Sequence, residues 1–276
     1  MADYVDRLFC EALASSPATH SVHSAHSKCI SKVDSDTSDE EEKDSIERIR
    51  STMMESEGTS GDEEVVRRVA AQLKIFRHVT KDCSVKRGKH VSISERKEKG
   101  FKSTSLTYGE IPFVTMALTL EKIKSRGGVR KNKSTFYDLG SGTGKACFAA
   151  SLLQPFRSVV GIEFLSSLHE VALETKLRFD ELPREAVASE LSALRFVCGD
   201  IISHDWSDAD VCFANTTCFK SDLMRALAKK SEKMKKGSWF VTTTKTLDSD
   251  HWEVVESIRY KMSWGFATLF HQRKVK

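Results

Sequence analysis

Between residues 134 and 243, short apolar runs alternate with longer stretches in which apolar and polar positions recur at helical spacing. The apolar runs predict strands near residues 134–138, 158–162, 194–198, 210–214 and 238–243. The amphipathic stretches predict helices near residues 145–153, 166–180 and 219–230. Strands and helices that alternate in this way form a parallel sheet with helices on both faces. Two further apolar runs, joined around residues 262–265, predict a terminal hairpin on the sheet's edge and a total of seven strands.

Two further helices are predicted upstream of this α/β part. From Asp62 onward, helical spacing places five apolar residues on one face, namely Val65, Val66, Val69, Leu73 and Phe76. A second helix is predicted to begin near Pro112 and to stop at Gly127. Its apolar face is formed by Phe113, Met116, Leu120 and Ile123. Residues 81–103 between the two are polar and strongly basic, and they predict a loop or a short irregular element.

Charge divides the chain into an acidic start and a basic remainder. Residues 1–64 carry 16 acidic and 6 basic side chains, whereas the whole chain has a net charge of +4, so residues 65–276 carry +14. The first 60 residues contain too few apolar side chains to offset the entropy lost on ordering. We therefore predict a disordered acidic tail over 1–60, a helical lead-in over 61–130 and an α/β domain over 131–276. The basic surplus suits a polyanionic partner.

Other features of the sequence exclude several protein classes. No apolar run approaches the 18 or so residues that a membrane span requires, and the first residues do not form a signal peptide, so we expect a soluble intracellular protein. The seven cysteines are odd in number and contain no Cys-x-x-Cys pair. They favour reduced thiols over a disulfide framework, and they give no indication of a metal site.

The segment YDLGSGTGKA, residues 137–146, is the strongest chemical signal in the chain. It fails the pattern of a phosphate-binding loop, because Gly140 is only four residues before Gly144 and Ala146 stands where that loop needs Ser or Thr. The dinucleotide-binding pattern needs a third glycine at the position of Lys145. Neither kind of phosphate ligand is therefore favoured.

The remaining pattern is a strand followed by an acid and three alternating glycines. This pattern suits a ligand that has no phosphate, and S-adenosylmethionine is such a ligand. Asp138 at the strand's tip can bind an ammonium group, and Glu163, at the end of the next strand, can accept both ribose hydroxyls. Asp200 could accept from the adenine amino group while Ile201 packs on the ring. Acids at the ends of three successive strands thus predict a cofactor site at one edge of the sheet.

Three stretches together resemble the disruptor-of-telomeric-silencing (DOT) family of histone H3 lysine methyltransferases. They are YGE at 108–110, YDLGSGTGK at 137–145 and VCFANTTCF at 211–219, and the resemblance spans about residues 105–245. It implies a Rossmann-like class I methyltransferase: an α/β fold with a mainly parallel seven-stranded sheet. It also implies that the YGE loop closes over the methionine end of S-adenosylmethionine.

The resemblance also implies roles for individual residues. Asn215 would lie beside the transferred methyl group, and Asn215 and Tyr108 would be the catalytic residues. Lys145 stands where the family usually has glutamine, and Trp264, with Phe266 and Phe270 as candidates, would line the channel for the substrate lysine. The full set of expected cofactor-binding residues is Tyr108, Gly109, Glu110, Asp138, Gly140, Gly142, Gly144, Lys145, Glu163, Asp200, Ile201 and Asn215.

The function implied by the resemblance is methylation of a lysine in the globular core of histone H3, on nucleosomes and in the nucleus. The basic segments 81–103 and 229–236 would contact DNA or histones. Two alternatives remain open at this point: a methyltransferase that acts on RNA or DNA, and a non-catalytic chromatin module that binds S-adenosylmethionine. Adenine N6 methylation is disfavoured, because the fourth strand ends in Asn-Thr-Thr-Cys (215–218) rather than in a proline-containing motif that stacks on the base.

Overall fold

A computed structural model describes residues 47, 49–51, 63–186 and 193–276. Almost all of the predicted acidic tail lies outside these residues, and the three predicted domains stay a prediction. The chain divides into two compact units, residues 1–72 and 73–276, and the second contains the sheet. The helix predicted from Asp62 is confirmed as α3 (Glu63–Val79).

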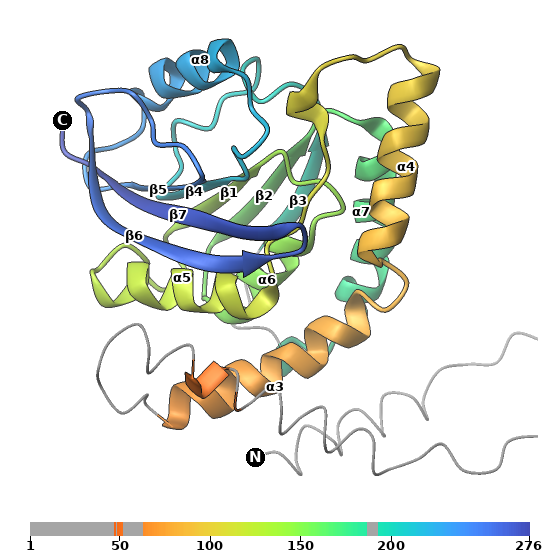
Figure 1. The fold of residues 1–276 in the computed structure, drawn as a ribbon. Helices are drawn as coiled ribbons and strands as arrows, with labels where there is room; N and C mark the ends of the chain where they lie inside the picture. Colours follow the sequence, from red (N-terminus) through yellow and green to blue (C-terminus); the bar gives the residue numbers. More distant parts are fainter. Residues whose placement is uncertain (1–46, 48, 52–62, 187–192) are drawn as a thin grey trace, which may run out of the picture. The chain divides into compact units, whose positions relative to one another are not determined.

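A seven-stranded sheet forms the centre of the second unit (Figure 1). Its strand order is β3-β2-β1-β4-β5-β7-β6; the first five strands are parallel, and β7 and β6 are antiparallel to their neighbours. The bounds are β1 (Thr135–Leu139), β2 (Ser158–Glu163), β3 (Ala193–Cys198), β4 (Val211–Ala214), β5 (Trp239–Thr243), β6 (Trp252–Met262) and β7 (Gly265–Lys274). The predicted strands and the terminal hairpin at the sheet's edge are confirmed.

Helices cover both faces of this sheet, as predicted (Figure 1). The apolar side chains of α8 pack with Tyr137 and Leu139 of β1 on one face. On the other face Phe136 contacts Phe156, which follows α6, at 5.5 Å between ring centroids. The helix bounds are α5 (Phe113–Ser125), α6 (Lys145–Leu153), α7 (Ser166–Asp180) and α8 (Ser221–Ser231), with short 3-10 turns η1 (Thr104–Leu106) and η2 (Arg184–Ala186).

The prediction of a loop over residues 81–103 is wrong, because most of this segment is the helix α4 (Val85–Glu98). Ser84 caps its first turn by accepting a hydrogen bond from the amide of Arg87 at 3.1 Å. The face that α4 buries consists of Gly88, Ser92 and Glu95. Because that face is small and polar, the helix lacks the apolar periodicity on which the prediction rested.

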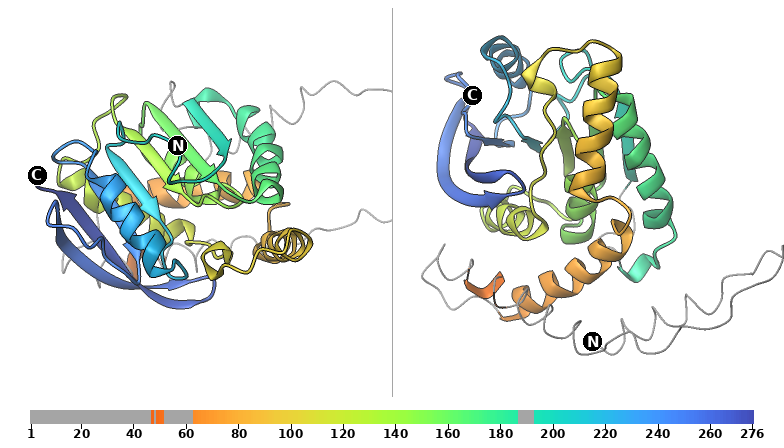
Figure 2. Two further views of the ribbon diagram at one scale, coloured as in Figure 1. Left: turned by 90° about the horizontal axis from the view of Figure 1, so that it is seen from above. Right: turned by 45° about the vertical axis from the view of Figure 1, so that its right-hand side comes forward.

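Glu95 is the residue that fastens α4 to α7, and Figure 2 shows the two helices lying beside each other. Its carboxylate accepts from the amides of Ser166 at 3.1 Å and Ser167 at 2.8 Å, at the start of α7. Lys99 donates to it as well, at 2.6 Å. Burial favours the neutral carboxyl, but the hydrogen bonds from Lys99 and the two serines outweigh it and lower the pKa of Glu95 to about 2. One helix thus supplies the N-terminal cap of another.

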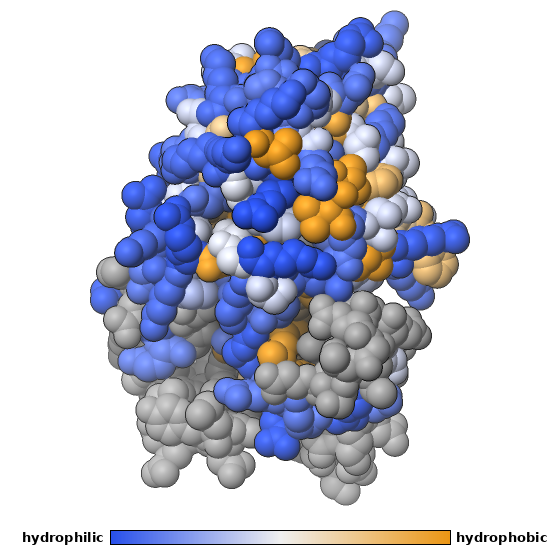
Figure 3. Space-filling model, turned by 90° about the vertical axis from the view of Figure 1, so that its left-hand side faces the viewer, coloured by the Kyte–Doolittle hydropathy of each residue, from blue (hydrophilic) through white to orange (hydrophobic). Residues whose placement is uncertain are grey.

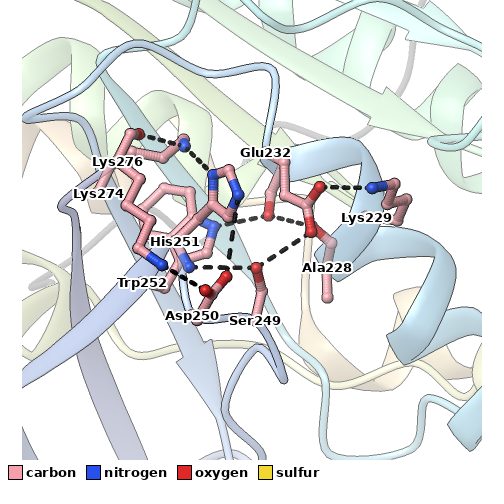
Figure 4. A network of polar contacts seen from close by, with 10 residues as sticks. Ala228, Lys229, Glu232, Ser249, Asp250, His251, Trp252, Lys274 and Lys276 are labelled. Carbon is pink, nitrogen blue, oxygen red and sulfur yellow. Dashed lines mark hydrogen bonds and ion pairs between the residues drawn. The ribbon is translucent and has the colours of Figure 1, made fainter.

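A polar network anchors the far end of the hairpin to α8 (Figure 4). Trp252 at the start of β6 donates its indole N–H to Ser231 at 2.8 Å. The ammonium of Lys274 in β7 lies 3.0 Å from Nδ1 of His251, and Ser249 donates to Glu232 at 3.2 Å. Figure 3 looks onto the side of the unit where β6 forms the sheet's edge, and hydrophilic residues separate small apolar groups there. Charged side chains on such an edge disfavour pairing with further strands.

The described residues hold no disulfide, because Cys83, Cys147, Cys198, Cys212 and Cys218 are all free. In that part of the chain no group of three His, Cys, Asp or Glu side chains could hold a metal ion. None of its helices is both long enough and apolar enough to cross a membrane.

Candidate active site

A cavity of about 350 Å³ lies at the carboxyl ends of the parallel strands β1, β2 and β4. This is the edge at which open α/β sheets bind ligands. Every residue expected to contact the cofactor lines the cavity except Gly144, which has φ +82° and forms the N-cap of α6. The geometry therefore brings together residues that are up to 107 positions apart in the chain, from Tyr108 to Asn215.

Asp138, at the end of β1, is a buried carboxyl group that no cationic side chain contacts in the part of the chain that the structure describes. It is 2% exposed, and among the described residues only the thiol of Cys147, at 3.8 Å, donates to it. Burial and the nearby charge of Glu163 raise the pKa of Asp138 to about 8. A ligand ammonium group in the cavity would supply the missing positive charge, so this residue fits the amino group of S-adenosylmethionine.

Glu163, at the end of β2, is held in a fixed orientation by two backbone amides. Gly142 donates to one carboxylate oxygen at 2.7 Å and Leu165 to the other at 2.8 Å. Burial raises the pKa of Glu163, and these amides partly offset that effect. Glu163 lines the cavity, and each of its carboxylate oxygens can accept a further hydrogen bond, as binding of two ribose hydroxyls requires.

Gly142 allows a close approach between the backbone and an aromatic ring in the site. A Cβ atom at this position would lie 2.7 Å from Cε2 of Tyr108, and its φ of +55° also favours glycine. Tyr108 in turn donates its hydroxyl to Glu110 and shares a hydrogen bond of 2.8 Å with the hydroxyl of Thr143. Burial raises the pKa of Tyr108, so this phenol stays protonated at neutral pH.

The YGE loop is fastened at its other end to the hairpin turn between β6 and β7. Ser263 accepts a hydrogen bond from the amide of Glu110 at 2.9 Å, and its own amide donates to the Glu110 carbonyl at 3.3 Å. Lys145, the first residue of α6, forms an ion pair of 2.8 Å with the carboxylate of Glu110. Lys145 is only 14% exposed and lines the cavity. Its ion pair therefore links the glycine loop to the YGE loop inside the site.

Asn215, just after β4, is clamped through both atoms of its amide group. Its Nδ2 donates to the carbonyl of Gly109 at 3.2 Å, and its Oδ1 accepts from the hydroxyl of Thr243 at 2.8 Å. That hydroxyl also accepts from the amide of Thr217 at 3.2 Å. The neighbouring Thr244 has φ +67°, a conformation that a β-branched residue rarely adopts. Strain and hydrogen bonds are thus concentrated where Asn215 meets the YGE loop.

The expected adenine end of the cavity is more open. Ile201 is buried, whereas Asp200 is exposed and accepts from the amide of Ile202 at 2.8 Å. Phe164 lines the cavity and contacts Phe101 at 5.5 Å between ring centroids. An apolar wall beside an acid suits a planar base with an amino group.

The three aromatic candidates for the lysine channel have different positions. The indole ring of Trp264 covers Gly109 so closely that a Cβ there would lie 2.6 Å from Cε3. Phe266 is 64% exposed, with the guanidinium of Arg259 5.0 Å from its ring centroid. Neither these two residues nor Phe270 line the cavity, and their roles stay predictions.

Sequence reasoning missed three residues that hold the site together. Thr143 lies inside the glycine motif, so its position could have been singled out from the sequence. Thr243 and Ser263 act through Asn215 and Glu110. Ser263 adjoins Trp264, which the resemblance had singled out, whereas the segment of Thr243 carries no signal that links it to the motifs. Only the folded chain brings β5 and the hairpin turn to the cavity.

The sequence model of the family described as "Histone methylation protein DOT1" matches residues 89–263. The chain belongs to this family. The match includes the YGE loop, the glycine loop and Asn215, so the DOT family predicted from the three stretches is confirmed. No curated protein matches the sequence.

Several solved structures resemble this DOT1 family member. One is a protein from Methanococcus maripaludis described as an S-adenosyl-L-methionine-dependent methyltransferase, with 20% identity, coverage of 47% of this chain and 56% of that chain, and a TM-score of 0.37. TrmN from Thermus thermophilus has 15% identity over 66% of this chain and 53% of that chain, with a TM-score of 0.46. This chain therefore spans little more than half the length of these two proteins.

A third similar structure is geranyl diphosphate C-methyltransferase from Streptomyces coelicolor in complex with S-adenosyl-L-homocysteine. It has 12% identity, coverage of 58% of this chain and 76% of that chain, and a TM-score of 0.42. The order of the sheet confirms the predicted Rossmann-like fold, and membership of the DOT1 family confirms the predicted methyltransferase class and its cofactor, S-adenosylmethionine.

Proposed function

We propose that this DOT1 family member transfers a methyl group from S-adenosylmethionine to a lysine in the globular core of nucleosomal histone H3, in the nucleus. The observation that carries the proposal is the hydrogen bond between Asn215 and Gly109. It joins two of the three stretches on which the resemblance rests, at a cavity that also contains Asp138 of the third. The family match over residues 89–263 supports the histone substrate.

Different residues of the cavity would bind different parts of the cofactor. Asp138 would bind the ammonium group, Glu163 the ribose hydroxyls, and Asp200 with Ile201 the adenine. Bound S-adenosylmethionine supplies an electrophilic methyl group attached to a positively charged sulfur. The YGE loop, held by Asn215, would exclude water from that end of the cavity.

The protein's own part in the reaction is alignment rather than proton transfer. Methyl transfer to an amine is an in-line displacement, so the incoming lysine must be uncharged and held on the far side of the methyl group. Tyr108 stays a neutral phenol because burial raises its pKa, and Asn215 carries no proton that titrates. A desolvating channel beside a cation lowers the pKa of the substrate lysine from its ordinary value of about 10.4. We therefore assign no general base.

Asn215 and Tyr108 would be the catalytic residues in the sense of shaping this end of the site. Because both amide atoms of Asn215 are occupied by Gly109 and Thr243, its side chain is fixed before any substrate arrives. Such preorganisation lowers the barrier without a cost in rearrangement during the reaction.

The test is transfer of radiolabelled methyl groups to nucleosomes, free histones and total RNA in parallel, with Asp138→Ala and Asn215→Ala as controls. We expect label on H3 within nucleosomes, and loss of that label in both variants. Label on RNA would replace the proposal with an RNA methyltransferase. Cofactor binding without label on any substrate would indicate a non-catalytic chromatin module.

A further inference from the structure

A second hollow, more open than the cavity and about 730 Å³ in volume, adjoins it at the start of α8. Among the residues that line this α8 groove are Thr217, Phe219, Lys220, Asp222, Arg225 and Lys245. Phe219, Lys220 and Asp222 line the cavity as well, so the two spaces are continuous. The cofactor contacts proposed above leave the groove unused.

The charge of the α8 groove is positive on balance. Its lining contains three cations, Lys220, Arg225 and Lys245, and one acid, Asp222. Arg225 and Lys245 line only the groove, whereas Lys220 and Asp222 also line the cavity. Among the described residues, no ion pair includes any of these four side chains. The part of the groove away from the cavity therefore offers two cations without an acid to neutralise them.

Lys245 is held in position before any ligand arrives. It is half-buried, and its ammonium donates to the carbonyl of Phe219, which leaves two N–H donors for a ligand. The preceding residue, Thr244, has φ +67°, and such strained conformations gather at ligand sites. Arg225 is exposed, and a guanidinium can donate to both oxygens of a carboxylate. The groove thus combines a fixed ammonium with an adaptable guanidinium.

We propose that the α8 groove binds a carboxylate side chain, Asp or Glu, of the substrate polypeptide, close in sequence to the lysine that receives the methyl group; this inference rests on the proposed function. Lys220 follows Asn215, the expected transfer point, by five residues. Even an extended chain of that length spans at most about 18 Å. An extended substrate covers the same length in about five residues, so a near neighbour of the target lysine reaches the groove.

A carboxylate on a polypeptide suits this groove better than a nucleic acid backbone. Asp222 lies among the lining residues and would repel the successive charges of a phosphate chain, whereas a single carboxylate can reach Arg225 and Lys245 alone. The groove also opens into the cavity, where the proposed acceptor is a side chain of a protein. Binding of an acidic neighbour would make the enzyme select one lysine among many by electrostatic complementarity.

The first experiment measures kcat/KM of the full chain on nucleosomes. The test variant is Arg225→Gln, Lys245→Gln, because these two cations line the groove but not the cavity. The matched control is Lys131→Gln, Lys133→Gln, which removes the same charge from exposed lysines ahead of β1, at the opposite edge of the sheet from the cavity. Each enzyme is tested on wild-type H3 and on H3 in which every acid within about five residues of the methylated lysine is replaced by its amide.

We expect the test variant to lose about fivefold in kcat/KM on wild-type nucleosomes, with its affinity for S-adenosylhomocysteine unchanged. The amide form of H3 should reduce the wild-type enzyme to the same level and should reduce the test variant no further. Equal losses in the test and control variants would overturn the proposal. Additive losses from the enzyme and H3 changes would overturn it as well, and weaker binding of free duplex DNA by the test variant alone would then assign the groove to nucleic acid.

A binding measurement separates this inference from the proposed function, because it requires no methyl transfer. Two fluorescent peptides carry a central lysine flanked either by aspartates or by asparagines, and anisotropy reports their binding in the presence of S-adenosylhomocysteine. The wild-type and control proteins should bind the aspartate peptide about fivefold more tightly, and the test variant should bind both peptides alike. If this holds while no histone is methylated, the groove stands and the proposed function falls. If nucleosomal H3 is methylated and wild type binds both peptides alike, the groove falls alone.

Discussion

Asp138 and Glu163 carry the same carboxyl group at the ends of neighbouring strands, but the groups that donate hydrogen bonds to them differ. Both are buried and both could be selected from the sequence as cofactor ligands. Glu163 accepts from two backbone amides, whereas the only donor to Asp138 among the described residues is a thiol. If a ligand ammonium group binds here, as proposed, the charge of Asp138 would depend on that ligand, and no sequence pattern carries that information.

Cofactor binding should release a proton from Asp138. Its pKa of about 8 means that the free protein holds this carboxyl protonated at neutral pH, and a bound ammonium group favours the ionised form. Affinity for S-adenosylhomocysteine should rise about tenfold for each unit between pH 5.5 and pH 7. Titration calorimetry in buffers of different ionisation enthalpy should detect close to one proton released. Asp138→Asn should bind weakly without that proton release, and the same release from this variant would contradict the assignment.

Thr243 should act as a positioning residue for Asn215. Thr243→Val keeps the shape but leaves the Asn215 oxygen and the Thr217 amide without their partner, so we expect unfolding to become easier by about 1–3 kcal/mol. The methyl-transfer rate constant should fall at least tenfold while the cofactor dissociation constant changes little. Thr242→Val is the control on the same strand, since its hydroxyl donates to the Lys245 carbonyl instead. Equal losses of rate in both variants would exclude a specific role for Thr243.

At the scale of elements, α4 marks the limit of prediction from apolar periodicity. The strands and the helices α5 to α8 bury apolar stripes, which the sequence displays directly. The buried face of α4 is Gly88, Ser92 and Glu95, whose partners are an aromatic ring and the first turn of another helix. The contacts of Glu95 exist only after residues 71 or more positions away have folded into place, and Tyr108 lies 20 positions from Gly88, so no local pattern announces them.

Gly88 should be required for packing despite its poor helix propensity. Replacement by alanine gains up to about 1 kcal/mol of propensity, but the new Cβ would lie 2.4 Å from the Tyr108 ring. We expect Gly88→Ala to lower the melting temperature and to weaken cofactor binding as Tyr108 moves. Ser94→Ala, on the exposed side of the same helix, should be neutral or stabilising. A Gly88→Ala protein as stable as Ser94→Ala would contradict the close contact.

Glu95 should stabilise the protein only above acidic pH. Because its pKa is lowered to about 2 from an ordinary value of 4.5, its contribution is present above pH 4.5 and is lost as the pH falls through 2. Glu95→Gln should cost about 2–3 kcal/mol at pH 7, measured by urea unfolding, and the difference should shrink toward pH 2.5. Glu98→Gln, exposed on the same helix, should leave stability within 0.5 kcal/mol or so. A cost for Glu95→Gln that is independent of pH would disprove the charge-based cap.

At the scale of the whole molecule, the sequence was sufficient for the sheet and for the edge at which the cavity lies. Seven strands and the acids at their ends follow from alternation and from the rule that ligands bind at the carboxyl edge. The fastening of the YGE loop did not follow, because Lys145, Ser263 and Asn215 reach it from three separate parts of the chain, and Asn215 is itself held by Thr243. Long-range polar contacts, unlike apolar faces, leave no periodic trace in the sequence.

The most direct measurement is mass spectrometry of histones after reaction of nucleosomes with S-adenosylmethionine carrying a deuterated methyl group. The proposed function predicts the labelled methyl on a lysine side chain in the globular core of H3, and none when Asn215→Ala replaces the wild-type chain. Label on arginine, on the histone tails alone or on the nucleic acid, or equal labelling by the Asn215→Ala protein, would contradict it.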